Sequence, residues 1–134
     1  MNVPDELRYS KDHEWASVED GDSDGGSGQR VRIGITDYAQ DALGDVVFVQ
    51  VPGIGTAVQA GESMGEVEST KSVSDIFAPL SGTIVEVNDA LGDHPETVNG
   101  DPYGDGWLCV IEVANEAELQ SLLDASAYRA LIEG

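Results

Sequence analysis

Short runs in which hydrophobic and polar residues alternate dominate the first two thirds of the chain, and they predict strands. In the segment 31–35 every second residue is Val or Ile, which is typical of a half-buried strand. Further β-rich runs predict strands at 46–51, 83–87 and 107–113. Gly and Pro between these runs mark turns.

The segment 64–77 predicts a β-hairpin. Two extended arms, 64–68 and 73–77, flank a polar bend at 69–72. The bend has no Asn-Gly or Asp-Gly pair, so the prediction rests on the β-branched arms and not on turn chemistry. Lys71 is therefore expected at or next to the hairpin tip.

Two stretches change to a helical pattern. Thr36 can cap a helix of about two turns over residues 37–43, with Gly44 as its stop. After the last strand, Leu residues at helical spacing predict a C-terminal helical segment that is broken near Asp124.

Together these elements predict a mainly β fold, either a β-sandwich or a small barrel, with little helix before the end. The 134 residues fit a single domain, 1–134, that is large enough for one hydrophobic core. We therefore look for one site.

The segment 19–28 is rich in Asp, Gly and Ser, and it predicts an exposed loop that joins two strands of a hairpin. Residues 20–25 also fit the opening of an EF-hand calcium loop. Its twelfth position is Val31, where such a loop needs a bidentate Glu. A solvated hairpin loop is the better interpretation, and no metal site is expected.

Charge narrows the classes of partner. The chain carries 26 acidic and 6 basic residues, a net charge of -20, which repels nucleic-acid phosphates and anionic membrane surfaces. A hydrophobic content of 40% argues against intrinsic disorder. We expect a halophilic protein, adapted to a salty cytoplasm in which cations screen the self-repulsion of the carboxylates.

The single cysteine and the first residues predict a soluble cytoplasmic protein. Cys109 cannot form an internal disulfide, and the start of the sequence lacks the basic residues and apolar run of a secretory signal. Cys109 lies between apolar neighbours, as a small core residue does. His13 and His94 belong to no closely spaced metal-ligand motif, so structural or surface roles are expected for both.

Lysine occurs only as Lys11 and Lys71. Composition alone leaves it open whether Lys71 is an incidental surface residue. Its small polar neighbours would leave the amine exposed, and nearby carboxylates would favour the charged form, unlike the surroundings of a Schiff-base lysine. An exposed lysine on a rigid bend is better suited to acylation by another enzyme.

The sequence around Lys71 resembles a lipoyl-attachment hairpin. Biotin carriers share this hairpin but typically have methionines beside the lysine, and lipoyl domains of 2-oxoacid dehydrogenases typically have Asp before it. The run here is similar instead to the H protein of the glycine cleavage system. The residues that form this lipoylation context are Glu68, Ser69, Thr70, Ser72, Asp75 and Gly82.

The resemblance covers essentially the whole chain, because further H-protein landmarks follow in family order. These are His13-Glu14-Trp15, the segment 34–40, Leu43-Gly44-Asp45, the segment 99–107 and Leu122-Leu123-Asp124.

The resemblance implies a lipoyl-type β-sandwich (barrel-sandwich hybrid) of two small antiparallel sheets, and lipoic acid attached covalently to Lys71. It implies a monomeric carrier without catalysis of its own. Glycine decarboxylase (P protein) would pass an aminomethyl group to the arm, an aminomethyltransferase (T protein) would take it to tetrahydrofolate, and dihydrolipoamide dehydrogenase (L protein) would reoxidise the arm. A lipoylating enzyme would act before them.

In the family the loaded arm folds into a surface cleft with acidic side chains near the amine. Glu14 and Asp75 match those positions, where carboxylates can form charge-assisted hydrogen bonds with a protonated amine. Asp12 and Tyr38 match positions expected to line the same cleft, although other members often carry His in place of Tyr38.

Two other classes of function stay open at this point. An enzyme with its own active site is disfavoured, because the sequence offers no nucleophile-base or metal constellation. The other class is an H-like protein that relays lipoate to other complexes, or an unmodified binding module.

Overall fold

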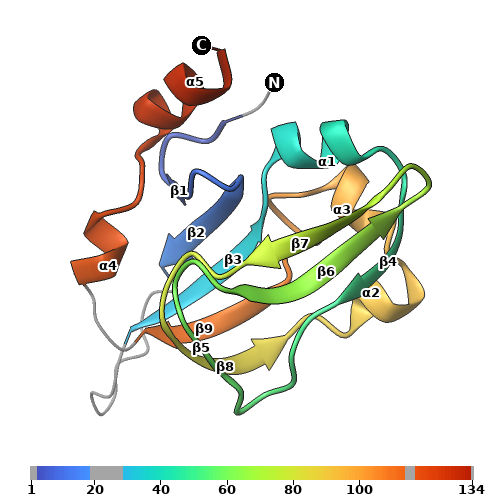
Figure 1. Cartoon of the computed structure of the whole chain (residues 1–134), viewed down its shortest axis with the longest axis horizontal. Coiled ribbons are helices and arrows are strands. Elements are labelled where there is room, and N and C mark those ends of the chain that lie inside the picture. The colour runs from blue at the N-terminus through green and yellow to red at the C-terminus, as the bar shows by residue number, and fades with distance from the viewer. Residues whose placement is uncertain (1–2, 19–28, 114–116, 134) are drawn as a thin grey trace.

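The structure is a computed structural model that describes residues 3–18, 29–113 and 117–133. Within these ranges the strands form two antiparallel sheets, which confirms the predicted β-sandwich (Figure 1). The larger sheet has the spatial order β1 (Arg8–Tyr9), β2 (Glu14–Val18), β3 (Arg30–Ile35), β9 (Cys109–Val113), β8 (Gly82–Val87) and β5 (Ala57–Val58). The smaller sheet has the order β4 (Val46–Gln50), β6 (Ser63–Ser69) and β7 (Val73–Phe77).

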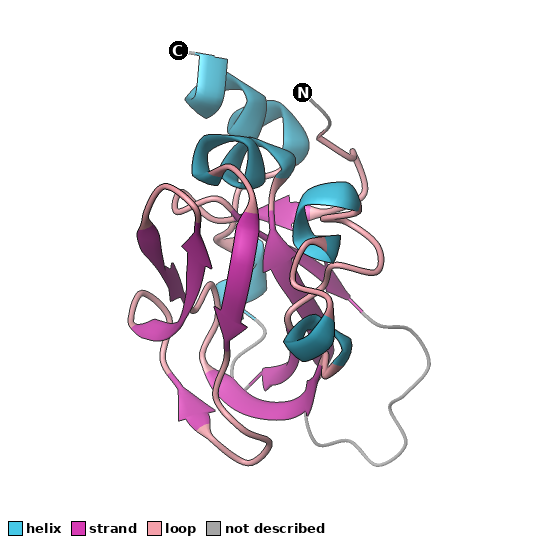
Figure 2. Ribbon diagram, turned by 90° about the vertical axis from the view of Figure 1, so that its right-hand side faces the viewer, coloured by secondary structure: helices cyan, strands magenta, loops and turns pink. Residues whose placement is uncertain are grey.

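Helices lie at one end of the sheets and on two opposite sides of them (Figure 1 and Figure 2). Two of them, α2 (Ala90–Asp93) and α3 (Thr97–Gly100), fall in a stretch that the sequence pattern left as turns, because a single helical turn is too short to show a helical period. The helices of the described residues are α1 (Asp37–Leu43), α2 (Ala90–Asp93), α3 (Thr97–Gly100), α4 (Ala117–Gln120) and α5 (Ala125–Glu133).

Buried aliphatic side chains fill the space between the two sheets. Ile33, Ile84 and Ile111 project from the larger sheet, and Val67 and Ile76 from the smaller one, into the same cluster. Full burial of one such side chain is worth about 1.5–3 kcal/mol. This cluster fixes the hairpin of β6 and β7 against the rest of the fold.

A second buried cluster holds α5 against β1 (Figure 1). The rings of Tyr9 and Tyr128 stack with their centroids 4.7 Å apart, and Tyr9 also pairs with Leu123 through a β-bridge. Asp124 separates α4 from α5, and its carboxylate accepts a hydrogen bond of 2.8 Å from the backbone nitrogen of Ala127. The predicted break near Asp124 is therefore confirmed.

The structure also confirms the predicted start and end of α1. The hydroxyl oxygen of Thr36 accepts a hydrogen bond of 3.2 Å from the backbone nitrogen of Ala39, which caps the first turn. Gly44 ends the helix with a φ of 83°, a conformation that favours glycine. The local sequence therefore predicts both ends of this helix correctly.

The hairpin predicted around segment 19–28 is present, since β2 pairs antiparallel with β3 and Val18 lies opposite Val31. The predicted loop itself lies outside the described residues, and so do the calcium-loop positions 20–25.

Candidate functional site

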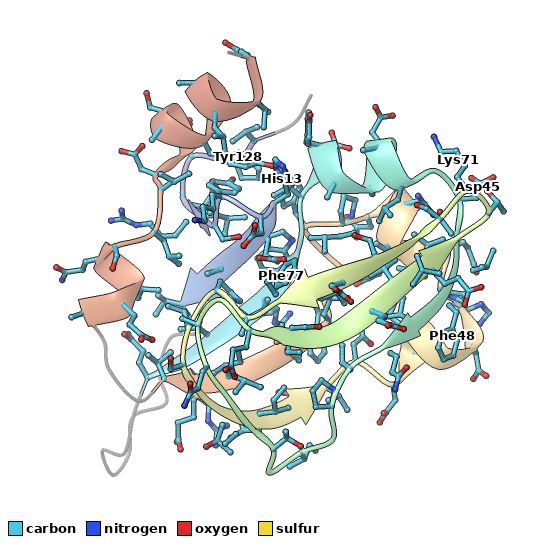
Figure 3. The ribbon with its side chains drawn as sticks, in the orientation of Figure 1. His13, Asp45, Phe48, Lys71, Phe77 and Tyr128 are labelled. Carbon is cyan, nitrogen blue, oxygen red and sulfur yellow. The ribbon has the colours of Figure 1, made fainter. Side chains whose placement is uncertain are left out.

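Lys71 lies at the tip of the β6–β7 hairpin, as the pattern predicts (Figure 3). The bend is fixed by Ser69 instead of a glycine turn. Its hydroxyl oxygen accepts hydrogen bonds of 3.1 Å from the backbone nitrogens of Lys71 and Ser72. Its own N–H donates to the Ser72 carbonyl at 2.8 Å. The exposed lysine therefore stands on an ordered bend.

The bend rests on the segment that links α1 to β4. The backbone nitrogen of Thr70 donates to the carbonyl oxygen of Asp45 at 3.0 Å, and Figure 3 shows Lys71 and Asp45 side by side at this end of the molecule. The Lys71 stem passes so close to Gly44 that a Cβ there would lie 3.1 Å from Lys71 Cε. Asn99 holds this segment, because its amide nitrogen donates to the Gly44 carbonyl at 2.9 Å.

A cleft of about 250 Å³ runs between α1 and the edge strand β7. We call it the acidic cleft. At one end it is lined by Ser72 and Val73, next to Lys71, and apolar side chains of α1 and the core form its walls. All four residues expected for an arm cleft line it. The lining residues are Asp12, His13, Glu14, Ile35, Tyr38, Ala39, Ala42, Leu43, Val67, Ser72, Val73, Ser74, Asp75 and Ile76.

Glu14 is the buried acid of the acidic cleft, with 2% of its surface exposed. Its carboxyl oxygens accept hydrogen bonds from the Ser10 hydroxyl at 2.6 Å and from the Phe77 backbone nitrogen at 3.1 Å. Burial nevertheless raises the pKa of Glu14 to about 8, and the charge of Asp12 adds to this effect. The carboxyl is thus mainly neutral at pH 7, where the sequence suggested a carboxylate.

His13 also lines the acidic cleft, although the sequence predicted only a structural or surface role for it. Its ring packs against Tyr38 with the centroids 4.7 Å apart, and its Nδ1 lies 2.8 Å from the hydroxyl oxygen of Tyr128. Its backbone has a φ of 72°, the only positive value of a non-glycine residue in the described part of the chain. Its position beside Glu14 was the only signal that the sequence offered.

Gly82 does not belong to the surroundings of Lys71, although the resemblance placed it in the lipoylation context. It begins β8 in the larger sheet, opposite Val113 of β9. A Cβ at this position would collide with the carbonyl oxygen of Glu112. Close packing of the sheet requires this glycine. Gly82 therefore contributes to the fold and not to the bend that carries Lys71.

Glu68 and Asp75 lie on the hairpin beside the lysine, and both are exposed. Glu68 lies opposite Phe48 on β4 and Val73 on β7. The three residues form a row across the smaller sheet next to the tip, and the two apolar ones are exposed. Asp75 borders the acidic cleft. The hairpin thus presents carboxylates both on its outer face and toward the cleft.

The remaining chemically active residues lie apart from this site. Cys109 is fully buried in β9, and burial raises the pKa of its thiol to about 12. His94 is exposed and lies 3.4 Å from the Glu96 carboxylate. No group of three or more potential metal ligands occurs among the described residues. No helix in that part of the chain is both long enough and apolar enough to cross a bilayer.

Comparison with known proteins shows which family the chain is similar to. Residues 7–134 match the family described as Glycine cleavage H-protein. The chain is 50% identical over 133 residues to the glycine cleavage system H protein of Anaeromyxobacter sp. (strain K), covering 99% of this chain and 98% of that one. It is 53% identical over 132 residues to the protein of the same name from Geobacillus kaustophilus (strain HTA426), covering 98% of each.

A solved structure shows the same fold. It is the crystal structure of a glycine cleavage system H protein from Mycobacterium marinum, with a TM-score of 0.85 and 47% sequence identity. The match covers 98% of this chain and 100% of that one.

Proposed function

The chain belongs to the glycine cleavage H-protein family, and on this premise we propose that Lys71 is the residue to which its lipoyl group is attached. As a member of the family, the chain is the lipoyl carrier of the glycine cleavage system. The observation that carries the proposal is the position of Lys71, an exposed amine on a bend that Ser69 holds in place. An acylating enzyme can reach this amine without any change in the fold.

The acidic cleft has the shape and chemistry to receive the arm. The Lys71 stem lies against Gly44, directly after α1, and Ala39, Ala42 and Leu43 of this helix line the cleft. Seven residues of helix span roughly 10 Å. An arm on Lys71 that follows α1 therefore passes along apolar walls toward Glu14.

The far end of the acidic cleft suits a cationic group. When bound, the lipoyl group supplies a disulfide that opens to accept a one-carbon amine unit and closes again on oxidation. A protonated amine beside Glu14 would lower the pKa of this carboxyl and draw it into a charge-assisted hydrogen bond. Asp12, Asp75 and Tyr38 would line the same end of the cleft.

The part of this chain in the system is to present and shelter the arm, while other components perform the chemistry. We assign no catalytic residue to it. Its partners in this proposal are the P, T and L proteins and the lipoylating enzyme, each of which acts on a monomeric carrier. The hairpin tip would be recognised by the lipoylating enzyme, and the end of the arm by the others.

Intact-mass spectrometry of the protein from its own host tests the attachment site. Lys11 is the other lysine and is also exposed, so Lys11→Arg is a matched control for Lys71→Arg. One lipoyl increment is expected in the wild type and in Lys11→Arg, and none in Lys71→Arg. An increment that persists in Lys71→Arg would overturn the assignment.

A further inference from the structure

The hydroxyl of Tyr128 lies where two walls of the acidic cleft meet. Tyr128 is fully buried on α5, and its hydroxyl oxygen lies 2.8 Å from His13 Nδ1 and 2.8 Å from the Thr36 hydroxyl oxygen. His13 precedes Glu14 in one wall, and Thr36 caps α1, which forms another. Figure 3 shows Tyr128 and His13 adjacent, although they are 115 positions apart in sequence.

We propose that Tyr128 is a positioning residue for the acidic cleft, which holds the His13–Glu14 wall against the start of α1 and fixes the neutral His13 tautomer that is protonated on Nε2. The functional consequence of this arrangement rests on the proposed role of the cleft as the resting place of the loaded arm. The C-terminal helix then shapes a site to which it contributes no lining residue.

The backbone of His13 needs such support. A φ of 72° is unfavourable for a residue with a side chain, and it persists only where the surroundings determine it. The His13 carbonyl accepts a hydrogen bond of 3.0 Å from the Thr36 backbone nitrogen, and its own N–H donates to the Ser10 carbonyl at 3.1 Å. Tyr128 adds the contact that fixes the ring. Because Glu14 follows directly, the conformation of His13 sets the backbone position from which the Glu14 carboxyl reaches Ser10 and Phe77.

One arrangement of the protons gives every hydroxyl of this group an acceptor. The Ala39 N–H donates to the Thr36 oxygen, so the Thr36 hydroxyl can donate to Tyr128 and the Tyr128 hydroxyl can donate to His13 Nδ1. Burial lowers the pKa of His13, and the nearby charge of Asp12 opposes this effect less strongly. A neutral ring that accepts at Nδ1 carries its proton on Nε2. A protonated His13 ring would donate from Nδ1 to the Tyr128 oxygen and so reverse the direction of these hydrogen bonds. The Thr36 hydroxyl would then have no acceptor among these groups.

Tyr9 provides a matched control. It is also fully buried, and its ring stacks on Tyr128 at an interplanar angle of 11°. Its hydroxyl donates to the Pro4 carbonyl at 2.6 Å, away from the acidic cleft. Tyr9→Phe and Tyr128→Phe therefore remove the same atom from the two members of one stacked pair, and they differ in what that atom holds.

The first measurement is ¹⁵N NMR of the His13 ring in the unlipoylated protein, with His94→Gln to identify the other histidine. The wild type and Tyr9→Phe are expected to show the tautomer protonated on Nε2, and Tyr128→Phe a mixture of tautomers. A wild-type ring protonated on Nδ1 would overturn the proposal without any variant. An unchanged His13 spectrum in a folded Tyr128→Phe protein would overturn it equally.

The second measurement is the lifetime of the loaded arm in the lipoylated proteins without the partner enzymes. We expect Tyr128→Phe to shorten this lifetime several-fold and Tyr9→Phe to leave it within twofold. A spectrum that changes only in Tyr128→Phe supports the positioning role even if all the lifetimes are equal. Equal lifetimes would overturn the expected effect of Tyr128 on the arm, whereas the proposed function of the acidic cleft is tested separately by Glu14→Ala, so the two failures can be told apart.

Discussion

Glu14 Oε2 accepts a hydrogen bond of 3.1 Å from the backbone nitrogen of Phe77, and this bond joins the floor of the acidic cleft to the end of β7. The other carboxyl oxygen accepts from the Ser10 hydroxyl. Two donors favour the carboxylate, yet burial outweighs them and raises the pKa to about 8. Glu14 is therefore held in place while it keeps its proton at neutral pH.

The free energy of unfolding should depend on the protonation of Glu14. Because the pKa of Glu14 in the folded state exceeds its ordinary value of 4.5, the folded protein binds more protons than the unfolded chain between these two values. We expect the free energy of unfolding of the wild type to fall relative to that of Glu14→Gln as the pH rises from about 4.5 to about 8, by a few kcal/mol. Urea unfolding of both proteins across this range measures the difference, and parallel profiles would contradict the assignment.

Removal of the carboxyl should expose the loaded arm to hydrolysis. A charge-assisted hydrogen bond to the amine is worth about 1.5–3 kcal/mol, so Glu14→Ala is expected to shorten the lifetime of the loaded arm by roughly tenfold or more. Glu66→Ala removes an exposed acid of the β6–β7 hairpin that does not line the acidic cleft, and it serves as the control. The hypothesis fails if the loaded arm of Glu14→Ala is hydrolysed at the wild-type rate.

Gly44→Ala should affect both the fold and the modification of Lys71. The backbone φ of 83° is unfavourable for alanine, and the new Cβ would press on the Lys71 stem at 3.1 Å. We expect a loss of about 1 kcal/mol or more in the free energy of unfolding, together with slower lipoylation. In contrast, nothing lies within 4 Å of a Cβ at Gly53, so Gly53→Ala should leave both quantities near wild type. Equal lipoylation rates would show that the Lys71 stem tolerates the change.

The charge of the chain predicts a dependence on salt. With a net charge of -20, self-repulsion opposes the compact state, and added cations screen it. The melting temperature is therefore expected to rise across a KCl series. A melting temperature that stays level or falls with KCl would count against adaptation to a salty cytoplasm.

Features set by neighbouring residues could be predicted from the sequence, and those set by distant contacts could not. The cap of Thr36 and the stop at Gly44 are local, and both occur as expected. The bend at Lys71 was predicted without a turn motif, and the structure supplies the reason in the hydrogen bonds of Ser69. A structural or surface role was predicted for His13, but its contact with Tyr128 was not, because Tyr128 lies 115 positions away in the sequence.

The distinction between features set by neighbouring residues and features set by distant contacts also applies to the acidic cleft. Glu14 and Asp75 are distant in sequence, and no periodicity brings them together. The family resemblance identified both as cleft residues, and the fold places them there through the pairing of β6 with β7 and the packing of α1. The neutral state of Glu14 could not be predicted, because it depends on burial by several elements.

The burial of Cys109 has a practical consequence for the study of this carrier. Thiol reagents attack thiolates, and a fully buried thiol whose pKa is raised to about 12 offers almost none. Since the chain has a single cysteine, a reagent added to the folded, reduced protein would find its targets on the arm alone. Titration should then count two reactive sulfurs per lipoylated molecule and none per unlipoylated one, with one more released on unfolding. Because Cys109 is buried in the core, thiol titration of the folded protein measures the state of the arm without interference.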